Sequence, residues 1–176
     1  MLTTADLDKV AYQSFVHSDY EKSADLYRQL TALAPENYDY WLGLARSLSW
    51  LGRGQEAEAA CVVSIILKPD EPSLYFHRGT FRQQQKNYTG AIEDYKRFLR
   101  DSALYDYWVD HAPFELGRCF EALGEYQTSL KWYTHYTIAS RPYVAPHIAR
   151  VKDKIAKLEQ NQETNSGSSE PENKSS

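Results

Sequence analysis

WLGLARSLSWLGRGQEAEAACVVSIILKP, residues Trp41–Pro69, is the stretch that determines the fold of this chain. Apolar and small residues recur on one helical face from Trp41 to Leu48, and a second such set runs from Ala57 to Ile65. Gly52-Arg53-Gly54 separates the two sets, and Pro69 ends the second, because glycine and proline disfavour helix interiors. The stretch therefore predicts two helices joined by a short turn.

The same pattern returns along the chain with a fixed period. Pro35 and Pro69 are 34 residues apart, and so are Ala45 and Gly79. A helical hairpin repeated every 34 residues is typical of the tetratricopeptide repeat, and the sequence resembles proteins of that family from about Thr4 to Pro142. The resemblance implies an all-α fold, a right-handed superhelix of about four helical hairpins with a C-terminal capping helix.

Counting from these markers places one repeat domain in residues 1–160. Gly79 and Gly117 are 38 residues apart, so about four residues are inserted before the last unit, within the segment 105–113. The stretch after residue 160 has no large apolar residue, and we expect it to be a disordered polar tail. The predicted units lie near residues 4–37, 38–71, 72–105 and 110–142, followed by a capping helix over 144–160 and the tail over 161–176.

Capping residues predict where two helices begin, and two arginines mark a third helix as unusual. Thr3 or Thr4 with Asp6 fits an N-terminal cap, and Ser18 with Glu21 fits a second capping box. Arg78 and Arg82 stand where other units have apolar residues. We expect this helix to pack less tightly, or to lay its arginine stems over the neighbouring unit.

Composition argues against several classes of function. The formal charge of −4 gives no general attraction to nucleic acid, and no apolar run is long enough to cross a bilayer. Two cysteines on apolar faces favour buried thiols, and the five histidines show no metal-binding spacing. No catalytic motif or phosphate-binding loop is present. We therefore expect a cytoplasmic, non-catalytic protein without a cofactor, a metal, a nucleic-acid partner or a membrane segment.

The resemblance also implies where a partner binds. In tetratricopeptide repeat proteins the first helix of each unit lines a concave face, and aromatic and arginine residues there are frequent binding hot spots. The alternative is that the aromatic residues only fill the core between units. Carried onto this sequence, the predicted groove residues are Tyr12, Phe15, Leu42, Arg46, Trp50, Phe76, His77, Phe114 and Arg118.

Two subfamilies were compared. Co-chaperones that hold acidic C-termini have a clamp of Lys, Asn and Arg, but here the corresponding positions hold Asp8, Tyr12, Ser73 and His77. The bacterial type III secretion chaperones of the translocator class are more similar. They resemble this chain over residues 10–100, in Tyr20–Ala24, Leu30–Pro35, Leu42–Leu44, Pro72 and Tyr75–His77.

The second resemblance implies a chaperone or adaptor that holds an extended segment of a secreted client protein in its groove. Two alternatives stay open. One is a structural subunit of a multiprotein complex, and the other is a regulatory module that self-associates, for which a homodimer is the simplest form.

Overall fold

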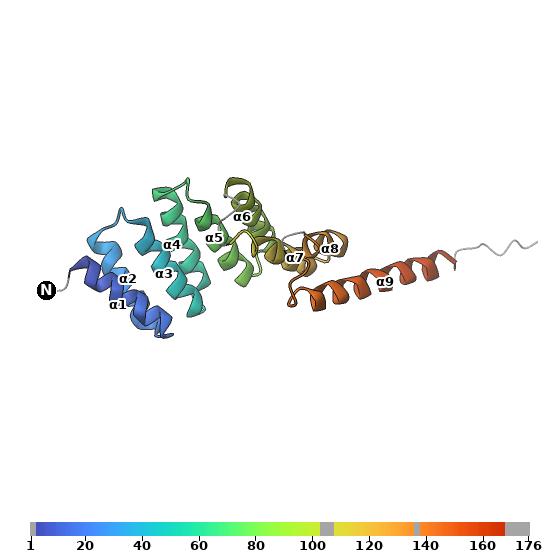
Figure 1. Ribbon diagram of the computed structural model, residues 1–176, viewed down its shortest axis with the longest axis horizontal. Coiled ribbons are helices and arrows are strands. Elements are labelled where there is room, and N and C mark those ends of the chain that lie inside the picture. Colours follow the sequence, from blue (N-terminus) through green and yellow to red (C-terminus); the bar gives the residue numbers. More distant parts are fainter. Residues whose placement is uncertain (1–2, 103–107, 136–137, 168–176) are drawn as a thin grey trace, which may run out of the picture. The chain divides into compact units, whose positions relative to one another are not determined.

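The computed structural model describes residues 3–102, 108–135 and 138–167, with side chains as far as residue 162. Within these ranges the chain contains nine α-helices and no β-strand, which confirms the predicted all-α class (Figure 1). The helices are α1 (Thr4–Val16), α2 (Tyr20–Leu33), α3 (Tyr38–Trp50), α4 (Gly54–Leu67), α5 (Pro72–Gln84), α6 (Tyr88–Asp101), α7 (Ala112–Ala122), α8 (Tyr126–Tyr133) and α9 (Ala145–Gly167).

The chain divides into two compact units. Met1–Ala112 forms the N-terminal unit, in which α1–α2, α3–α4 and α5–α6 are successive antiparallel hairpins stacked on one another (Figure 1). Pro113–Ser176 forms the C-terminal unit, in which α9 packs on α8 of the last hairpin. That the two units behave as one domain stays a prediction.

Every hairpin turns through one residue with a left-handed backbone. Glycine adopts this conformation freely, but two of the four positions hold a serine and a lysine. In each turn the next residue donates its N–H to the carbonyl five residues earlier, as in a Schellman motif. The first three positions are 34 residues apart and the fourth follows after 38, as the predicted insertion requires: Ser18 (φ 63°), Gly52 (φ 74°), Lys86 (φ 62°) and Gly124 (φ 80°).

These turns correct one predicted cap and confirm another. Thr3 and Asp6 form the capping box predicted at the start of α1. The predicted capping box of Ser18 and Glu21 is wrong, because Ser18 is the left-handed turn residue. The carboxylate of Asp19 caps α2 instead, accepting from the Lys22 N–H at 3.3 Å.

The recurrence of proline has a structural explanation between hairpins. Trp41 donates its indole N–H to the carbonyl of Pro35 at 2.8 Å, and the hydroxyl of Tyr75 donates to the carbonyl of Pro69 at 3.1 Å. Each bond ties the start of a first helix to the end of the preceding hairpin. The aromatic residue and the proline therefore recur together, because the aromatic side chain donates a hydrogen bond to the backbone carbonyl of the proline.

Arg78 and Arg82 form partly buried ion pairs, and Arg82 reaches the neighbouring hairpin, in line with one of the two expectations for this helix. Arg78 binds both carboxylate oxygens of Asp94 on α6, at 2.9 and 2.6 Å. Arg82 reaches Asp94 at 3.0 Å and Glu58 on α4 at 2.8 Å. The Asp94 side chain is only 3% exposed, so the pairs connect three helices inside the N-terminal unit.

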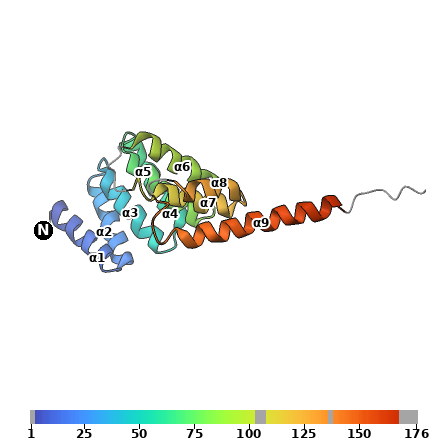
Figure 2. The same cartoon turned by 45° about the vertical axis from the view of Figure 1, so that its right-hand side comes forward.

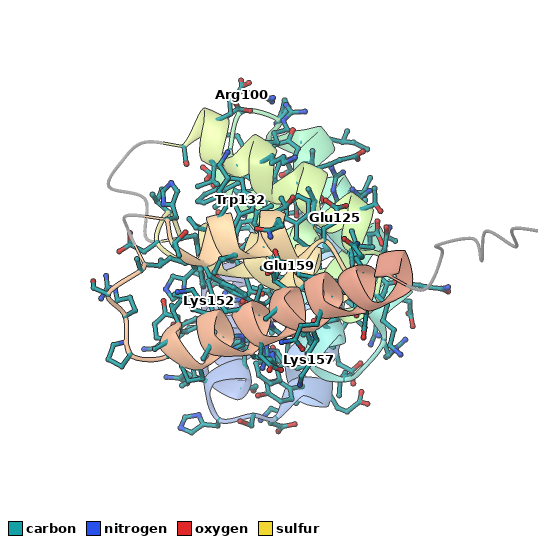
Figure 3. All side chains as sticks on the ribbon, turned by 90° about the vertical axis from the view of Figure 1, so that its right-hand side faces the viewer. Arg100, Glu125, Trp132, Lys152, Lys157 and Glu159 are labelled. Carbon is teal, nitrogen blue, oxygen red and sulfur yellow. The ribbon has the colours of Figure 1, made fainter. Side chains whose placement is uncertain are left out.

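The C-terminal unit has its own core. Tyr133, Ile138, Val144 and Val151 are fully buried, with Ile148 and Ile155 of α9 packed against them. The helix continues to Gly167, past its predicted end at residue 160, and extends beyond α8 (Figure 2). Lys152, Lys157 and Glu159 stand on its outer side (Figure 3). The residues after 167 lie outside the described part of the chain.

None of the helices in the described ranges combines the length and the apolar character needed to cross a membrane.

Replacing Lys86 by glycine should stabilise the protein. A left-handed conformation is unfavourable for residues with a Cβ atom, so the variant should gain up to about 1 kcal/mol. Gly52→Ala is the matched control, because nothing lies within 4 Å of an added Cβ there and only the backbone conformation is affected. Urea unfolding should shift in opposite directions for the two variants; shifts in the same direction would contradict the turn assignment.

Replacing Asp94 by asparagine should destabilise the protein by about 3 kcal/mol, because it leaves the partly buried Arg78 without its charge partner and removes one of the two carboxylates that pair with Arg82. The control is Asp101→Asn on the same helix, where the carboxylate pairs with Arg97 and Arg100 at the surface. That control should leave the urea midpoint nearly unchanged. Equal midpoints for the two variants would show that the buried network adds nothing to stability.

Candidate functional site

A pocket of about 280 Å³ opens between the first helices of the N-terminal unit. Its wall combines side chains of α1, α3 and α5 with Trp108 from the connection that precedes α7. We call it the aromatic pocket. It is lined by Phe15, Arg46, Ser49, Trp50, Phe76, His77, Thr80, Phe81, Gln84 and Trp108.

One wall of the pocket is an aromatic cluster. Trp50 stacks on Tyr20 with ring centroids 5.3 Å apart, and Tyr20 meets Phe15 edge-on at 5.5 Å. Trp50 nevertheless remains 65% exposed. A large aromatic side chain that is held in place by its neighbours, and still open to solvent, can bury apolar area against a partner at a low cost in conformational entropy.

Trp108 belongs to a second aromatic cluster of the lining. Its ring stacks on Phe76 with centroids 4.8 Å apart and lies edge-on to His77 at 5.5 Å. Phe76 also packs against Tyr95 and Phe98 of α6 and is only 5% exposed. Phe76 therefore belongs mainly to the core and offers little of its surface to a partner.

Arg46 lines the pocket beside Phe15. Its guanidinium carbon is 4.5 Å from the centroid of the Phe15 ring, a cation–π contact. Burial, together with the nearby charge of Arg46, lowers the pKa of His77 to about 4. His77 is thus neutral at pH 7, and Arg46 is the one charged side chain among the lining residues that the structure describes.

The nine predicted groove residues fall into three groups. Phe15, Arg46, Trp50, Phe76 and His77 line the aromatic pocket. Tyr12 and Leu42 lie on α1 and α3 outside its lining. Phe114 and Arg118 belong to the C-terminal unit. That any of the nine binds a partner stays a prediction.

The two residues of the C-terminal unit have local partners. Phe114 contacts Tyr133, Tyr143 and His147 edge-on or tilted, at 5.0–5.7 Å, and packs against the core of that unit. Arg118 is exposed and forms an ion pair with Glu115 one turn earlier, at 3.1 Å. Phe114 therefore acts as a core residue of its own unit.

Five lining residues are not in the predicted list: Ser49, Thr80, Phe81, Gln84 and Trp108. The first four lie on first helices close to predicted positions, and the hydroxyl of Ser49 donates to the amide oxygen of Gln84 at 2.6 Å. Trp108 had a partial signal, since Tyr105–Trp108 repeats the letters of Tyr38–Trp41. In the sequence, however, Trp108 lies farther from the small residue of its unit than Trp41 does, which indicated only that the two tryptophans are not equivalent.

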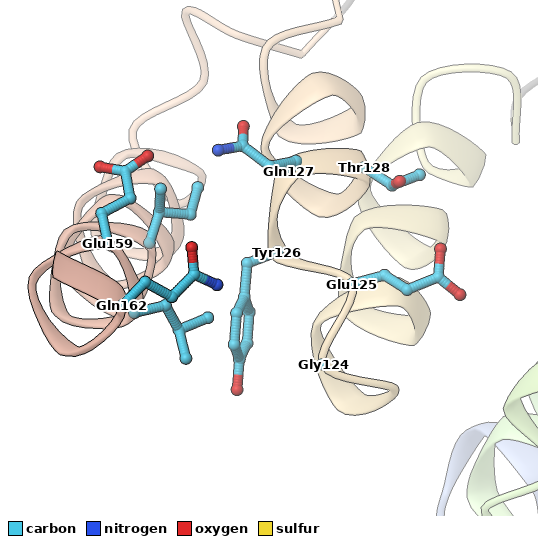
Figure 4. Close-up of a pocket in the computed structure, with 9 residues that line it drawn as sticks. Gly124, Glu125, Tyr126, Gln127, Thr128, Glu159 and Gln162 are labelled. Atoms are coloured by element: carbon cyan, nitrogen blue, oxygen red, sulfur yellow. The ribbon is translucent and has the colours of Figure 1, made fainter. Parts of the chain in front are cut away.

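A second cavity, of about 390 Å³, lies within the C-terminal unit between α8 and α9 (Figure 4). Tyr126, Ile155 and Leu158 form its apolar part, while Glu125, Glu159 and Gln162 are among its polar residues. It offers one aromatic ring and no cationic lining residue. The aromatic pocket, with five aromatic side chains and one guanidinium, is the stronger candidate for recognition of a partner.

Comparison with known proteins agrees with this architecture. Residues 15–72 match the profile of the family described as Tetratricopeptide repeat. No curated protein sequence matches the chain. Among solved structures, that of MamA protein is 15% identical, covers 96% of this chain and 96% of its own, and has a TM-score of 0.68.

Two further structures contain bound partners. The first TPR of Spaghetti (RPAP3), bound to the HSP90 peptide SRMEEVD, is 22% identical and covers 69% of this chain and 93% of its own, with a TM-score of 0.63. The TPR2B domain of yeast Sti1 in its pHsp70 complex is 20% identical, with coverages of 69% and 96% and a TM-score of 0.60. These similarities show that the fold is of the tetratricopeptide repeat type.

His77 should make stability depend on pH in a defined window. Its folded-state pKa, about 4, lies below its usual 6.5, so the unfolded chain binds more protons between these values. Stability should therefore fall as pH decreases from 6.5 to 4, by up to about 1.4 kcal/mol per pH unit from this group. His77→Gln should reduce that slope in urea unfolding, whereas His17→Gln, at an exposed position, should not. Parallel slopes for wild type and His77→Gln would refute the assignment.

Proposed function

We propose that this protein is a non-catalytic interaction module that binds an extended segment of a partner protein in the aromatic pocket. The observation that carries the proposal is the exposed, positionally fixed Trp50 beside Phe15 and Arg46. Aromatic and arginine side chains with this combination of rigidity and exposure are enriched among residues that dominate binding energy.

The fold supports the same class of function. Stacked helical hairpins present their first helices side by side, which suits an extended chain. Two proteins of similar fold are described with peptides or chaperone complexes bound. The carboxylate-clamp residues expected from the co-chaperones are replaced by Asp8, Tyr12, Ser73 and His77, so we propose a different ligand.

The biological role we propose is that of an adaptor or a secretion-type chaperone in the cytoplasm, with a secreted protein as its client. Its support is the sequence resemblance of residues 10–100 to the translocator-class chaperones. An apolar anchor in the client would fill the pocket, and the flanking chain would lie along α1, α3 and α5. Such a segment would be held unfolded until it is released.

The test is selection of binding peptides from a random peptide library by the full chain, followed by titration of synthetic copies. Trp50→Ala should weaken their binding by at least about 2 kcal/mol, roughly thirtyfold, because it removes an exposed anchor. Its melting temperature should barely change. The matched control is Trp132→Ala on α8, a half-buried tryptophan of the C-terminal unit.

Phe15→Ala provides a second variant, because Phe15 supports both Tyr20 and Arg46. Full peptide affinity in both Trp50→Ala and Phe15→Ala, with the folded state intact, would exclude the aromatic pocket as the binding site. Failure to select any peptide would count against an extended-segment ligand altogether.

A further inference from the structure

We infer that Arg46 makes the pocket selective for partner segments that carry an Asp or Glu side chain next to their apolar anchor. The inference rests on the proposed function, because it assigns a ligand chemistry to the same pocket. It concerns a side-chain carboxylate and a residue on α3 that is not at any of the clamp positions compared above.

Arg46 differs from the other arginines in its partners. Within the part of the chain that the structure describes, no carboxylate lies within 4.0 Å of its guanidinium, and its recorded contact is with the Phe15 ring. Eight other arginines form ion pairs with carboxylates in the same ranges: Arg28, Arg53, Arg78, Arg82, Arg97, Arg100, Arg118 and Arg150.

The stacked position leaves Arg46 able to bind an anion. A guanidinium that lies over a ring uses one face, while its five N–H donors point outward in its own plane. Those donors match the two oxygens of a carboxylate, which can accept two parallel hydrogen bonds. The side chain of Phe15 has no oxygen or nitrogen atom, so its contact with Arg46 leaves the N–H donors to other partners.

The charge of the pocket favours an anion with a single negative charge. Among the described residues of the lining there is no carboxylate, and the other polar side chains are Ser49, His77, Thr80 and Gln84. Burial keeps His77 neutral at pH 7, so one positive charge is available. One guanidinium balances a carboxylate, whereas a phosphate monoester, with nearly two negative charges, would remain partly uncompensated.

The aromatic walls make the pairing effective. A half-buried guanidinium has lost part of its hydration, and a partner carboxylate restores its hydrogen bonds in surroundings of low dielectric constant. The anion must lie close to whatever fills the space between Phe15, Trp50 and Trp108. Acidic and apolar residues should therefore be near neighbours in the bound segment.

The experiment uses the peptides selected by the full chain, synthesised with amidated C-termini so that only side-chain carboxylates contribute. Each is compared with its Glu→Gln or Asp→Asn counterpart and with a phosphoserine version. The protein variants are Arg46→Gln and, as matched control, Arg97→Gln. Arg97 also lies over a ring, 4.0 Å from the centroid of Tyr75, but already pairs with Asp101.

The expected result is an enrichment of Asp or Glu beside an aromatic or aliphatic residue. Arg46→Gln should weaken the acidic peptide about ten- to a hundredfold and leave its amide counterpart unchanged. Arg97→Gln should bind both peptides as the wild type does. Combining Arg46→Glu with a peptide that carries Lys in place of Glu should restore much of the loss.

Two outcomes would overturn the inference while leaving the proposed function intact. One is equal affinity of acidic and amide peptides for the wild type, with Trp50→Ala still weakening both. The other is tighter binding of the phosphoserine peptide, lost in Arg46→Gln, which would replace the carboxylate by a phosphate. If Trp50→Ala has no effect either, the proposed function fails together with the inference.

Discussion

Two hairpins of this protein depend on close contact between a small residue in the first helix and a large side chain in the second. A Cβ atom added at Gly79 would lie 2.9 Å from the ring of Tyr95, and one at Gly117 would lie 2.6 Å from that of Tyr133. Ala45 occupies the same position in α3 and is fully buried. Because these contacts fix the register of the two helices, they also fix which face of each first helix is left for the aromatic pocket.

The fold could be predicted because the constraints that define it act on the backbone and recur in each repeat unit. Close approach requires Ala or Gly, and the end of each hairpin requires a carbonyl that Trp41 or Tyr75 can reach. Such requirements leave the same residue types 34 positions apart. Phe15, Arg46, Trp50, Phe76 and His77 could be predicted together for the same reason, since equivalent positions of successive first helices share a face.

Other features could not be predicted, because they depend on contacts that are not repeated from one unit to the next. Trp108 comes from the longer connection after α6, and only the folded chain shows that it stacks on Phe76. Asp94 looks like any helical acid in the sequence, but two arginines of α5 reach it. From the sequence, Ser18 could be a helix cap or a turn residue, because serine is common in both. The hydrogen bond from the Asp19 N–H to the Ser14 carbonyl shows that it is the turn residue.

Arginine has two uses in the N-terminal unit: one stabilises the packing of the helices, and the other belongs to the site that we propose for recognition. Arg78 and Arg82 lie deep between helices, and carboxylates within the chain satisfy their charge. Arg46 is set just as firmly, against Phe15, yet the described chain supplies no carboxylate for it. Arg78 and Arg82 thus have carboxylate partners within the chain, whereas Arg46 has none among the described residues. Arg46 lies in the pocket that is lined by aromatic side chains. Local departures of this kind concentrate where a protein meets its ligands, because there the missing partner is supplied by another molecule.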